Sequence, residues 1–265
     1  MATRTRRSQR RTEALSRERI VEAAVELLDT AGESGLTFRA LTERLATGPG
    51  AIYWHVANKD ELLGAATDAV IAAAVTVGTV AGTVGAATGT VGAATEGSRP
   101  ATGEPGTTEP PASPQDDIRG VALGLFDAIA RHPWLATQLA AQLSRSPWGT
   151  VTPRIFESIG RRVRALDVPE SSWFTVTSAL VHYILGAAGQ NAANNASARS
   201  LPPGVDRDRF IDTVSRAWGE LDPDEYPFTR AVADQMRGHD DREQFLAGVD
   251  LVLAGITATH HHGQE

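Results

Sequence analysis

The sequence predicts an all-α protein with an N-terminal three-helix helix-turn-helix domain and a C-terminal helical bundle. Apolar residues recur three and four positions apart along most of the chain, which is the spacing of one buried helix face. No stretch alternates apolar and polar residues as a half-buried strand would. Between residues 36 and 56, two short helical segments flank a break that contains Gly48, an arrangement typical of a helix-turn-helix.

The composition limits the classes of protein that the chain can form. At 265 residues it can hold one small and one medium domain, and the absence of cysteine excludes disulfides and thiolate metal sites. No apolar run follows the Arg-rich N-terminus, so we expect no secretory signal and a cytoplasmic protein. The net charge is −7, yet residues 1–19 carry seven Arg and two Glu, whereas residues 65–265 carry 15 basic and 23 acidic side chains. The basic end therefore lies beside the helix-turn-helix, where it can contact phosphates.

Residues 1–15 are expected to form a disordered basic arm, and residues 16–31 form the first helix. The arm has little to bury, so it is either a solubilising tail or an extension that orders on DNA. Ser16 is a suitable N-cap for the helix, and Gly32 is placed to end it. One face of this helix carries Ile20, Ala23, Ala24, Leu27, Leu28 and Ala31. It completes a DNA-binding domain over residues 16–63.

The two helices of the motif follow. Thr37 can cap the first, which carries Leu41 and Leu45 inward. The break is Ala46-Thr47-Gly48, where we expect Gly48 to supply a left-handed conformation. Pro49 suits the start of a second helix of about eight residues, since its missing N–H would be unpaired there. The pattern alone would also fit an ordinary helical hairpin.

The next helix begins after Asn58, with Glu61 at the spacing of a capping box. Before it, Ile52 and Val56 are expected to face inward, leaving Gly50, Ala51, Tyr53 and His55 exposed. The wording Y-W-H-V-x-N-K followed by Glu-Leu-Leu resembles the signature of the tetracycline-repressor (TetR) family of bacterial transcription regulators. The resemblance covers residues 20–63 and implies binding to double-stranded DNA as a dimer.

Residues at the family's DNA-contacting positions have suitable chemistry. Arg39 can pair with guanine O6 and N7, although a solvated helix residue is the alternative. Thr37 offers a hydroxyl and a helix N-terminus to phosphate, and the Ala51 methyl can touch a thymine methyl. Lys59 opposes its helix dipole, which a phosphate partner would explain. The remaining candidates are Pro49, Gly50, Tyr53, Trp54 and His55.

Trp54 and the Pro49-Gly50 pair need separate comment. For Trp54, packing between helices is the favoured alternative to a DNA contact. Where the tetracycline repressor opens its recognition helix with Gln and Pro, this chain has Pro49 and Gly50. The amide side chain that could read a base is therefore missing, and the operator sequence of the tetracycline repressor cannot be assumed for this chain.

A connecting helix over residues 64–76 leads into a low-complexity stretch. The uncharged run 69–95 is long enough to cross a membrane, but it lacks Leu and Phe and is mostly Ala, Gly, Thr and Val, so we expect no membrane segment. It contains the near-repeat TVGAATG and TVGAATE, and Pro, Gly, Thr and Ser dominate the residues that follow. We therefore expect a flexible linker over residues 77–115.

Residues 116–259 are expected to form an all-helical ligand-binding and dimerisation domain, followed by a tail at 260–265. Helical spacing predicts segments at 116–131, 134–143, 153–166, 169–195, 206–221, 228–236 and 241–259. The long helix 169–195 is apolar around most of its circumference early on, which favours packing on a partner as well as on its own domain. His260-His261-His262 could hold a metal, but we expect an incidental tail.

The segments AIARHPW, LVHYILG and FLAGVDLVLAGI also resemble the tetracycline-repressor type of C-terminal domain. This resemblance implies that the long helix and the last helix of two subunits form a four-helix interface, giving a homodimer. It also places Leu139 and Gln190 where tetracycline repressors chelate a magnesium–drug complex with His and Glu. Since Leu cannot ligate a metal and neutral Gln is a poor magnesium ligand, we expect neither a metal nor a cofactor.

A small-molecule effector is nevertheless expected in this domain. His182 and Gln190 can hydrogen-bond a neutral or aromatic ligand, and Leu125 and Phe156 can form apolar walls, with His132 and Trp134 nearby. For each of these residues plain core packing is the alternative.

The leading interpretation is a ligand-responsive repressor that binds a palindromic operator as a dimer and is released by a small hydrophobic or aromatic ligand. A DNA-binding regulator without an inducer is the first alternative. An enzyme is the second, but the sequence offers no catalytic residues: it has no paired carboxylates near a His, no phosphate-binding Gly-rich loop and no Ser/His/Asp grouping.

Overall fold

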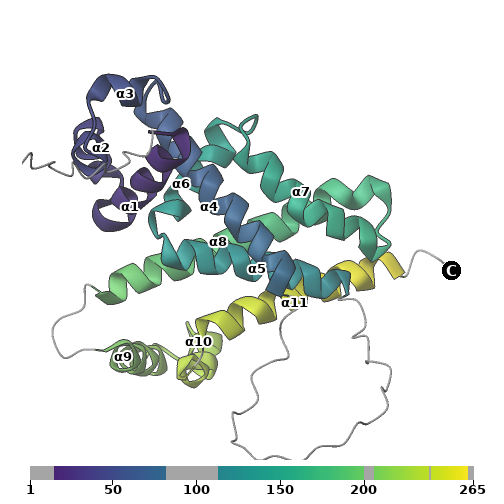
Figure 1. The fold of residues 1–265 in the computed structure, drawn as a ribbon. Helices are drawn as coiled ribbons and strands as arrows, with labels where there is room; N and C mark the ends of the chain where they lie inside the picture. The colour runs from purple at the N-terminus through teal and green to yellow at the C-terminus, as the bar shows by residue number, and fades with distance from the viewer. Residues whose placement is uncertain (1–14, 82–112, 200–205, 239, 262–265) are drawn as a thin grey trace, which may run out of the picture. The chain divides into compact units, whose positions relative to one another are not determined.

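The computed structural model describes residues 15–81, 113–199, 206–238 and 240–261, and all the regular structure in these ranges is helical (Figure 1). The all-α prediction is therefore confirmed. The chain divides into an N-terminal unit up to Ala69 and a C-terminal unit from Val70. Helix α4, Lys59–Ala81, begins in the first unit and ends in the second.

The N-terminal unit contains α1 (Arg17–Gly35), α2 (Phe38–Leu45), α3 (Pro49–Tyr53) and the first part of α4. The predicted caps are present: the hydroxyls of Ser16 and Thr37 accept the N–H groups of Arg19 and Ala40. Gly32 kinks α1 with φ 64°, after which the helix continues for one short turn. The core of the unit includes Ile20, Ala24, Leu28, Leu36, Leu41, Ile52, Val56, Leu62 and Ala66.

The turn between α2 and α3 differs from the sequence prediction. The left-handed residue is Ala46, with φ 49° and ψ 45°, whereas Gly48 is extended at φ −84° and ψ 153°. The left-handed residue must directly follow the helix, so that the N–H of Thr47 can reach the carbonyl of Thr42 at 3.1 Å. Gly48 instead precedes Pro49, a position that requires extended backbone.

The second helix of the motif is also shorter than expected. It ends at Tyr53 after five residues, because the N–H of His55 turns back to the carbonyl of Ile52 at 2.9 Å. Val56 donates to the same carbonyl at 3.1 Å and remains buried. The inward anchors Ile52 and Val56 were therefore predicted correctly, although the helix does not span both.

The C-terminal unit is a helical bundle. Its helices are α5 (Pro114–Arg131), α6 (Trp134–Arg145), α7 (Val151–Val163), α8 (Trp173–Arg199), α9 (Arg207–Gly219), α10 (Pro227–Val232) and α11 (Asp241–His261), with 3-10 turns at Arg164–Leu166, Glu170–Ser172 and Ala233–Met236. Because α4 continues to Ala81 and Ser113 caps α5, both ends of the expected linker 77–115 are helical. Residues 82–112 lie outside the described residues.

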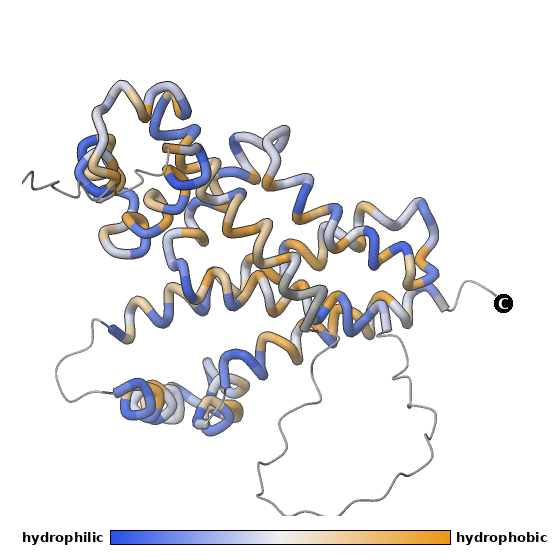
Figure 2. The backbone as a smooth tube through the Cα atoms, viewed as in Figure 1, coloured by the Kyte–Doolittle hydropathy of each residue, from blue (hydrophilic) through white to orange (hydrophobic). Residues whose placement is uncertain are grey.

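Helix α8 is at the centre of this bundle and contacts α5, α6, α7 and α11 (Figure 1). Its buried residues include Leu180, Val181 and Ile184. Hydrophobic and hydrophilic residues alternate along the helices of the bundle (Figure 2). Helix α11 passes close to α8 at Gly248, where any added methyl group would overlap the ring of Tyr183. The Tyr183 hydroxyl donates to the carbonyl of Phe245 at 3.0 Å, and burial raises the pKa of this phenol.

No helix in the described part of the chain is long and apolar enough to cross a membrane. This result covers α4 as far as Ala81, while the rest of the uncharged run, 82–95, lies outside the described residues.

The geometry of the α2–α3 turn generates a stability prediction. Replacing Ala46 by Gly should stabilise the N-terminal unit by about 1 kcal/mol, because Gly adopts the left-handed conformation without steric cost. Gly48→Ala is the matched variant: its backbone is extended and an added Cβ meets no atom within 4 Å. We expect it to be neutral or stabilising by about 0.5 kcal/mol.

Hydrogen exchange of amides in α1 to α3 measures the opening free energy of this unit separately from the C-terminal one. Slower exchange in Ala46→Gly is expected. Destabilisation by Gly48→Ala together with no effect of Ala46→Gly would mean that Gly48 is the strained position.

Candidate DNA-binding surface and effector cavities

Helix α3 and the residue after it expose two aromatic side chains, while neighbouring apolar residues are buried in the core of the unit. Tyr53 is 54% exposed and Trp54 is 89% exposed, while Ile52 and Val56 are buried. Gly50 and Pro49 are exposed at the start of the helix, and Ala51 and His55 are half-buried. The backbone can therefore approach a ligand closely at Gly50, with the aromatic side chains beyond it.

The packing alternative for Trp54 is wrong, because its indole lies almost entirely in solvent. The aromatic residue that braces α3 is Tyr53, whose ring stacks on Phe38 of α2 with centroids 4.6 Å apart and an interplanar angle of 14°. This stack fixes the orientation of α3 relative to α2 and leaves Trp54 as an exposed apolar group without a packing role in this unit.

Two candidates on α2 already have intramolecular roles. The Thr37 hydroxyl caps α2, although it keeps its own proton to donate. Arg39 is 88% exposed and its Nε donates to Glu43 Oε1 at 2.9 Å. The hydrogen bond and charge of Glu43 raise the pKa of Arg39 above its usual range. The Nε–H of Arg39 is therefore engaged, while the Nη groups of its guanidinium have further N–H donors to offer a partner.

The start of α4 is tied to both ends of α1. Lys59 Nζ donates to the carbonyl of Glu33 at 2.6 Å, near the end of α1, so the ammonium has a protein partner that the sequence did not predict. At the other end, Arg17 lies 3.3 Å from a carboxylate oxygen of Glu61. Glu61 also accepts the N–H of Ala57 at 2.8 Å, and these contacts lower its pKa, the backbone hydrogen bond first and Arg17 second.

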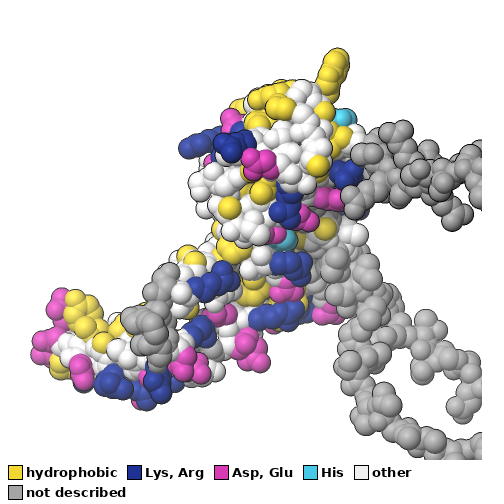
Figure 3. All heavy atoms as spheres, turned by 60° about the vertical axis from the view of Figure 1, so that its left-hand side comes forward, with side chains coloured by type: hydrophobic (Ala, Val, Ile, Leu, Met, Phe, Trp, Pro, Cys, Tyr) yellow, Lys and Arg dark blue, Asp and Glu magenta, His cyan; other side chains and the backbone are white. Residues whose placement is uncertain are grey.

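Asn58 caps α4 as predicted, accepting the N–H of Glu61 at 2.8 Å. The second half of the capping box is displaced by one residue, because Glu61 bonds the N–H of Ala57 instead of that of Asn58. On the face shown in Figure 3, basic and acidic side chains are interspersed among the described residues, without an extended area of one sign.

In the C-terminal unit, a cavity of about 220 Å³ lies between α5, α6 and α8. It is lined by Ile129, Ala136, Leu139, Ala140, Leu143, Val181, His182, Leu185 and Gly186. Of the six predicted ligand-binding residues, only His182 lines it. Its walls are otherwise apolar, so His182 is the group that could orient a ligand.

The other predicted ligand residues lie elsewhere. Leu125 is fully buried in the core, since its position on α5 faces the neighbouring helices. His132 and Trp134 pack edge to face with centroids 6.1 Å apart, and Phe156 lies 6.1 Å from the Phe174 ring. Gln190 is exposed and donates to Asn194 on the next turn of α8 at 2.9 Å.

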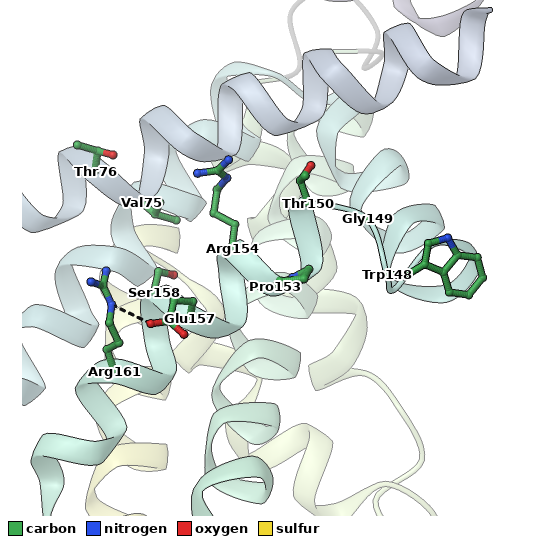
Figure 4. A pocket seen from close by; sticks show the side chains of 10 residues that line it. All are labelled: Val75, Thr76, Trp148, Gly149, Thr150, Pro153, Arg154, Glu157, Ser158 and Arg161. Carbon is green, nitrogen blue, oxygen red and sulfur yellow. Dashed lines mark ion pairs between the residues drawn. The ribbon is translucent and has the colours of Figure 1, made fainter.

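A larger groove of about 910 Å³ lies between the C-terminal part of α4 and α7 (Figure 4). Its lining consists of Val75, Thr76, Trp148, Gly149, Thr150, Pro153, Arg154, Glu157, Ser158 and Arg161, all in the C-terminal unit. This groove was not predicted from the sequence. The available signal was the polar series Arg154, Glu157, Ser158 and Arg161, which occupies one face of α7.

Within the residues that the structure describes, no group of three or more His, Asp or Glu side chains is placed to hold a metal ion. The predicted histidine tract is only partly described: His260 is half-buried near the end of α11, and His262 lies outside the described residues.

Comparison with known proteins agrees with this architecture. The family model "Bacterial regulatory proteins, tetR family" matches residues 20–66, and "Tetracyclin repressor-like, C-terminal domain" matches residues 107–260. The chain is 43% identical over 243 residues to the class D tetracycline repressor of Escherichia coli, covering 91% of this chain and 89% of that one. It is 48% identical over 56 residues to a helix-turn-helix transcriptional regulator of Saccharopolyspora erythraea, where the match spans 24% of that relative and 21% of this chain.

Solved structures show the same fold. The transcriptional regulator SCO7222, a TetR from Streptomyces coelicolor, is 65% identical with a TM-score of 0.74, covering 93% of this chain and 99% of that one. ActR of the same organism, crystallised with actinorhodin, shares the fold at 22% identity and a TM-score of 0.63, covering 93% and 98% of the two chains. With both of its units matched, the chain belongs to the TetR family of bacterial transcriptional regulators and has a tetracycline repressor-like C-terminal domain.

Proposed function

We propose that this DNA-binding regulator is a ligand-responsive repressor that binds a palindromic operator as a dimer and is released by a small hydrophobic or aromatic ligand. The observation that supports DNA reading most directly is the exposed face of α3, where Tyr53 and Trp54 project from a helix anchored by Ile52. A relative with matching length is named as a tetracycline repressor, and ActR was crystallised in complex with actinorhodin. We propose no catalytic activity and no cofactor.

The proposed contacts divide between bases and phosphates. Arg39 is assigned to guanine and Ala51 to a thymine methyl, because both chemistries read base edges in the major groove. Thr37, Tyr53, Trp54 and His55 are assigned to the phosphate backbone on either side, and Pro49 and Gly50 allow close approach. Lys59 can reach phosphate only by sharing or leaving the carbonyl of Glu33.

Uncharged surfaces on α8 and α11 support the dimer. No charged residue occurs from Trp173 through Ala198, although α8 is 27 residues long. Its exposed face carries the small or neutral residues Thr175, Ala179, His182, Gly186 and Ala193. On α11 the exposed face carries Ala247, Ala254, Gly255 and Ala258 around Leu251, which is 75% exposed. Small residues on both helices allow the helix axes of two subunits to approach closely.

In such a dimer two α3 helices reach successive major grooves about 34–36 Å apart. A ligand that prefers a dimer with another separation of the two α3 helices lowers the affinity for DNA. By linkage, bound DNA lowers the affinity for the ligand by the same factor. The small volume of the His182 cavity, about 220 Å³, lies below the usual range for ligand sites and supports the alternative, a regulator of this family without an inducer.

The base-reading role of Arg39 is tested by a pair of variants with opposite expected effects. Arg39→Ala should weaken binding to the selected operator by about 1–3 kcal/mol. Glu43→Gln should strengthen it, because the carboxylate that competes with DNA for the Arg39 guanidinium is then removed. Fluorescence anisotropy on duplexes selected from random DNA, with random duplexes alongside, measures both.

Arg44→Ala is the control for Arg39→Ala. It lies on the same helix but pairs with Glu26 of α1 at 2.6 Å, so it should change specific and random binding equally little. If Arg39→Ala also leaves both kinds of binding intact, Arg39 does not read bases.

The dimer is tested at Leu251. Leu251→Asp should convert the wild-type dimer to monomers and abolish preference for palindromic over half-site duplexes, because the carboxylate would be buried without a partner. Thr137→Asp, at an exposed position of α6, is the matched control and should leave the dimer, and hence its mass in solution, unchanged. Sedimentation equilibrium reads the mass, and a monomeric wild-type chain would contradict the proposal.

A further inference from the structure

We propose that the α8 helices of two subunits cross at Gly186 in antiparallel directions, and that His182 of each subunit contacts Gln190 of the other. This inference deepens the proposed dimer and rests on it. It assigns to the contact between subunits two residues that the sequence predicted for the effector.

The exposed row of α8 has similar chemistry in both directions from Gly186. In a two-fold dimer with antiparallel helices, positions equally far before and after the crossing residue face each other. Along α8 the exposed residues recur at four, three and four positions on either side of Gly186. Counted outward, the pairs are His182 and Gln190, Ala179 and Ala193, and Thr175 and Ser197. They match two hydrogen-bonding groups, two methyl groups and two hydroxyls, so the row is complementary to a copy of itself.

The charge distribution of α8 also suits a copy of the same helix. The uncharged part of the helix runs from Trp173 through Ala198 and extends almost equally far on both sides of Gly186. A face of this kind neither repels its copy nor leaves a buried charge without a partner. Two copies can therefore approach along most of the helix.

Gly186 allows the closest approach at the crossing itself. A Cβ built at this position meets no described atom within 4 Å outside the backbone of its own helix, so packing within the subunit does not require a glycine here. Glycine destabilises a helix interior relative to alanine. A second helix backbone at this point accounts for the missing side chain.

His182 and Gln190 reach the same level in this arrangement. Each lies four residues from Gly186, about 6 Å along the helix axis, on opposite sides of it. Gln190 Nε2 donates to Asn194 Oδ1 at 2.9 Å, which leaves Gln190 Oε1 to accept from a ring N–H of His182 in the other subunit. Because the symmetry repeats this contact, two such hydrogen bonds fix the register of the two helices.

Disulfide crosslinking of the full-length protein tests the crossing, because the chain has no cysteine and each variant carries a single thiol. Two cysteines join when their Cα atoms are about 4.4–6.8 Å apart, which at a crossing holds for the central residue and its own copy. Gly186→Cys should form covalent dimers on mild oxidation, measured on a non-reducing gel. Glu22→Cys, at an exposed position of α1, is the control for chance collisions and should not crosslink.

A mixture of two variants tests the pairing of His182 with Gln190. His182→Cys and Gln190→Cys should each crosslink poorly when oxidised alone, because each residue lies about 12 Å along the helix axis from its own copy. After the two variants are mixed and exchange subunits, a covalent dimer that contains one chain of each should form readily. Mass spectrometry of the crosslinked peptides identifies the joined positions.

Gly186→Leu tests the close approach without a crosslink. It should raise the dissociation constant of the dimer about tenfold or more, because the larger side chain holds the two helices apart. The subunit itself should fold as the wild type does, since leucine favours a helix over glycine. Gly219→Leu, on α9 in equally open surroundings, is the matched control and should leave the dimer unchanged. Sedimentation velocity over a concentration series measures the dissociation constant, and circular dichroism measures the helix content.

The failure of this inference can be distinguished from failure of the dimer. If the wild type is dimeric but Gly186→Cys crosslinks no faster than Glu22→Cys, the helices do not cross at Gly186 and the dimer stands. Absence of the mixed product of His182→Cys and Gln190→Cys would likewise overturn the pairing alone. A monomeric wild type contradicts the proposed dimer and, with it, this inference.

Discussion

Burial of one face of α8 is the constraint on which the C-terminal unit depends. Leu180, Val181 and Ile184 are excluded from water by α5, α7 and α11, and at Gly248 the α11 backbone comes so close to Tyr183 that no side chain fits between them. The inner face is committed to these neighbours, and no charged residue occurs on α8 from Trp173 through Ala198, before its last residue Arg199. The same helix therefore organises its own subunit and supplies the surface proposed for its partner.

In the N-terminal unit, four of the proposed DNA-contacting residues are held by neighbours that are not themselves proposed to contact DNA. Tyr53 and Trp54 are exposed because Ile52 and Val56 are buried behind them, and Phe38 stacks on Tyr53. The charged candidates already have protein partners, Glu43 for Arg39 and the Glu33 carbonyl for Lys59. If these two side chains contact DNA as proposed, the new contacts form beside the existing ones or at their expense, so the net free energy is smaller than the sum of the new contacts.

The helices, their caps and their buried faces could be predicted from the sequence, because helical spacing and capping chemistry are local. Ser16, Thr37 and Asn58 cap the helices that they precede. The failures have tertiary or steric causes. Conformational preference favoured Gly48 over Ala46 for the left-handed residue, and hydrophobicity favoured burial of Trp54. The α4–α7 groove depends on which helices become neighbours, which the spacing of apolar residues within one helix does not reveal.

The two ties between α1 and α4 have a mechanical consequence. Arg17 holds Glu61 near the beginning of α1, and Lys59 holds the carbonyl of Glu33 near its end. The first turn of α4 is thus bridged to α1 near both ends of α1, so a rotation of this turn about the α4 axis would break at least one of the two contacts as long as α1 stays in place. Because both contacts lie within the N-terminal unit, they join the first turn of α4 to the helices that carry α3.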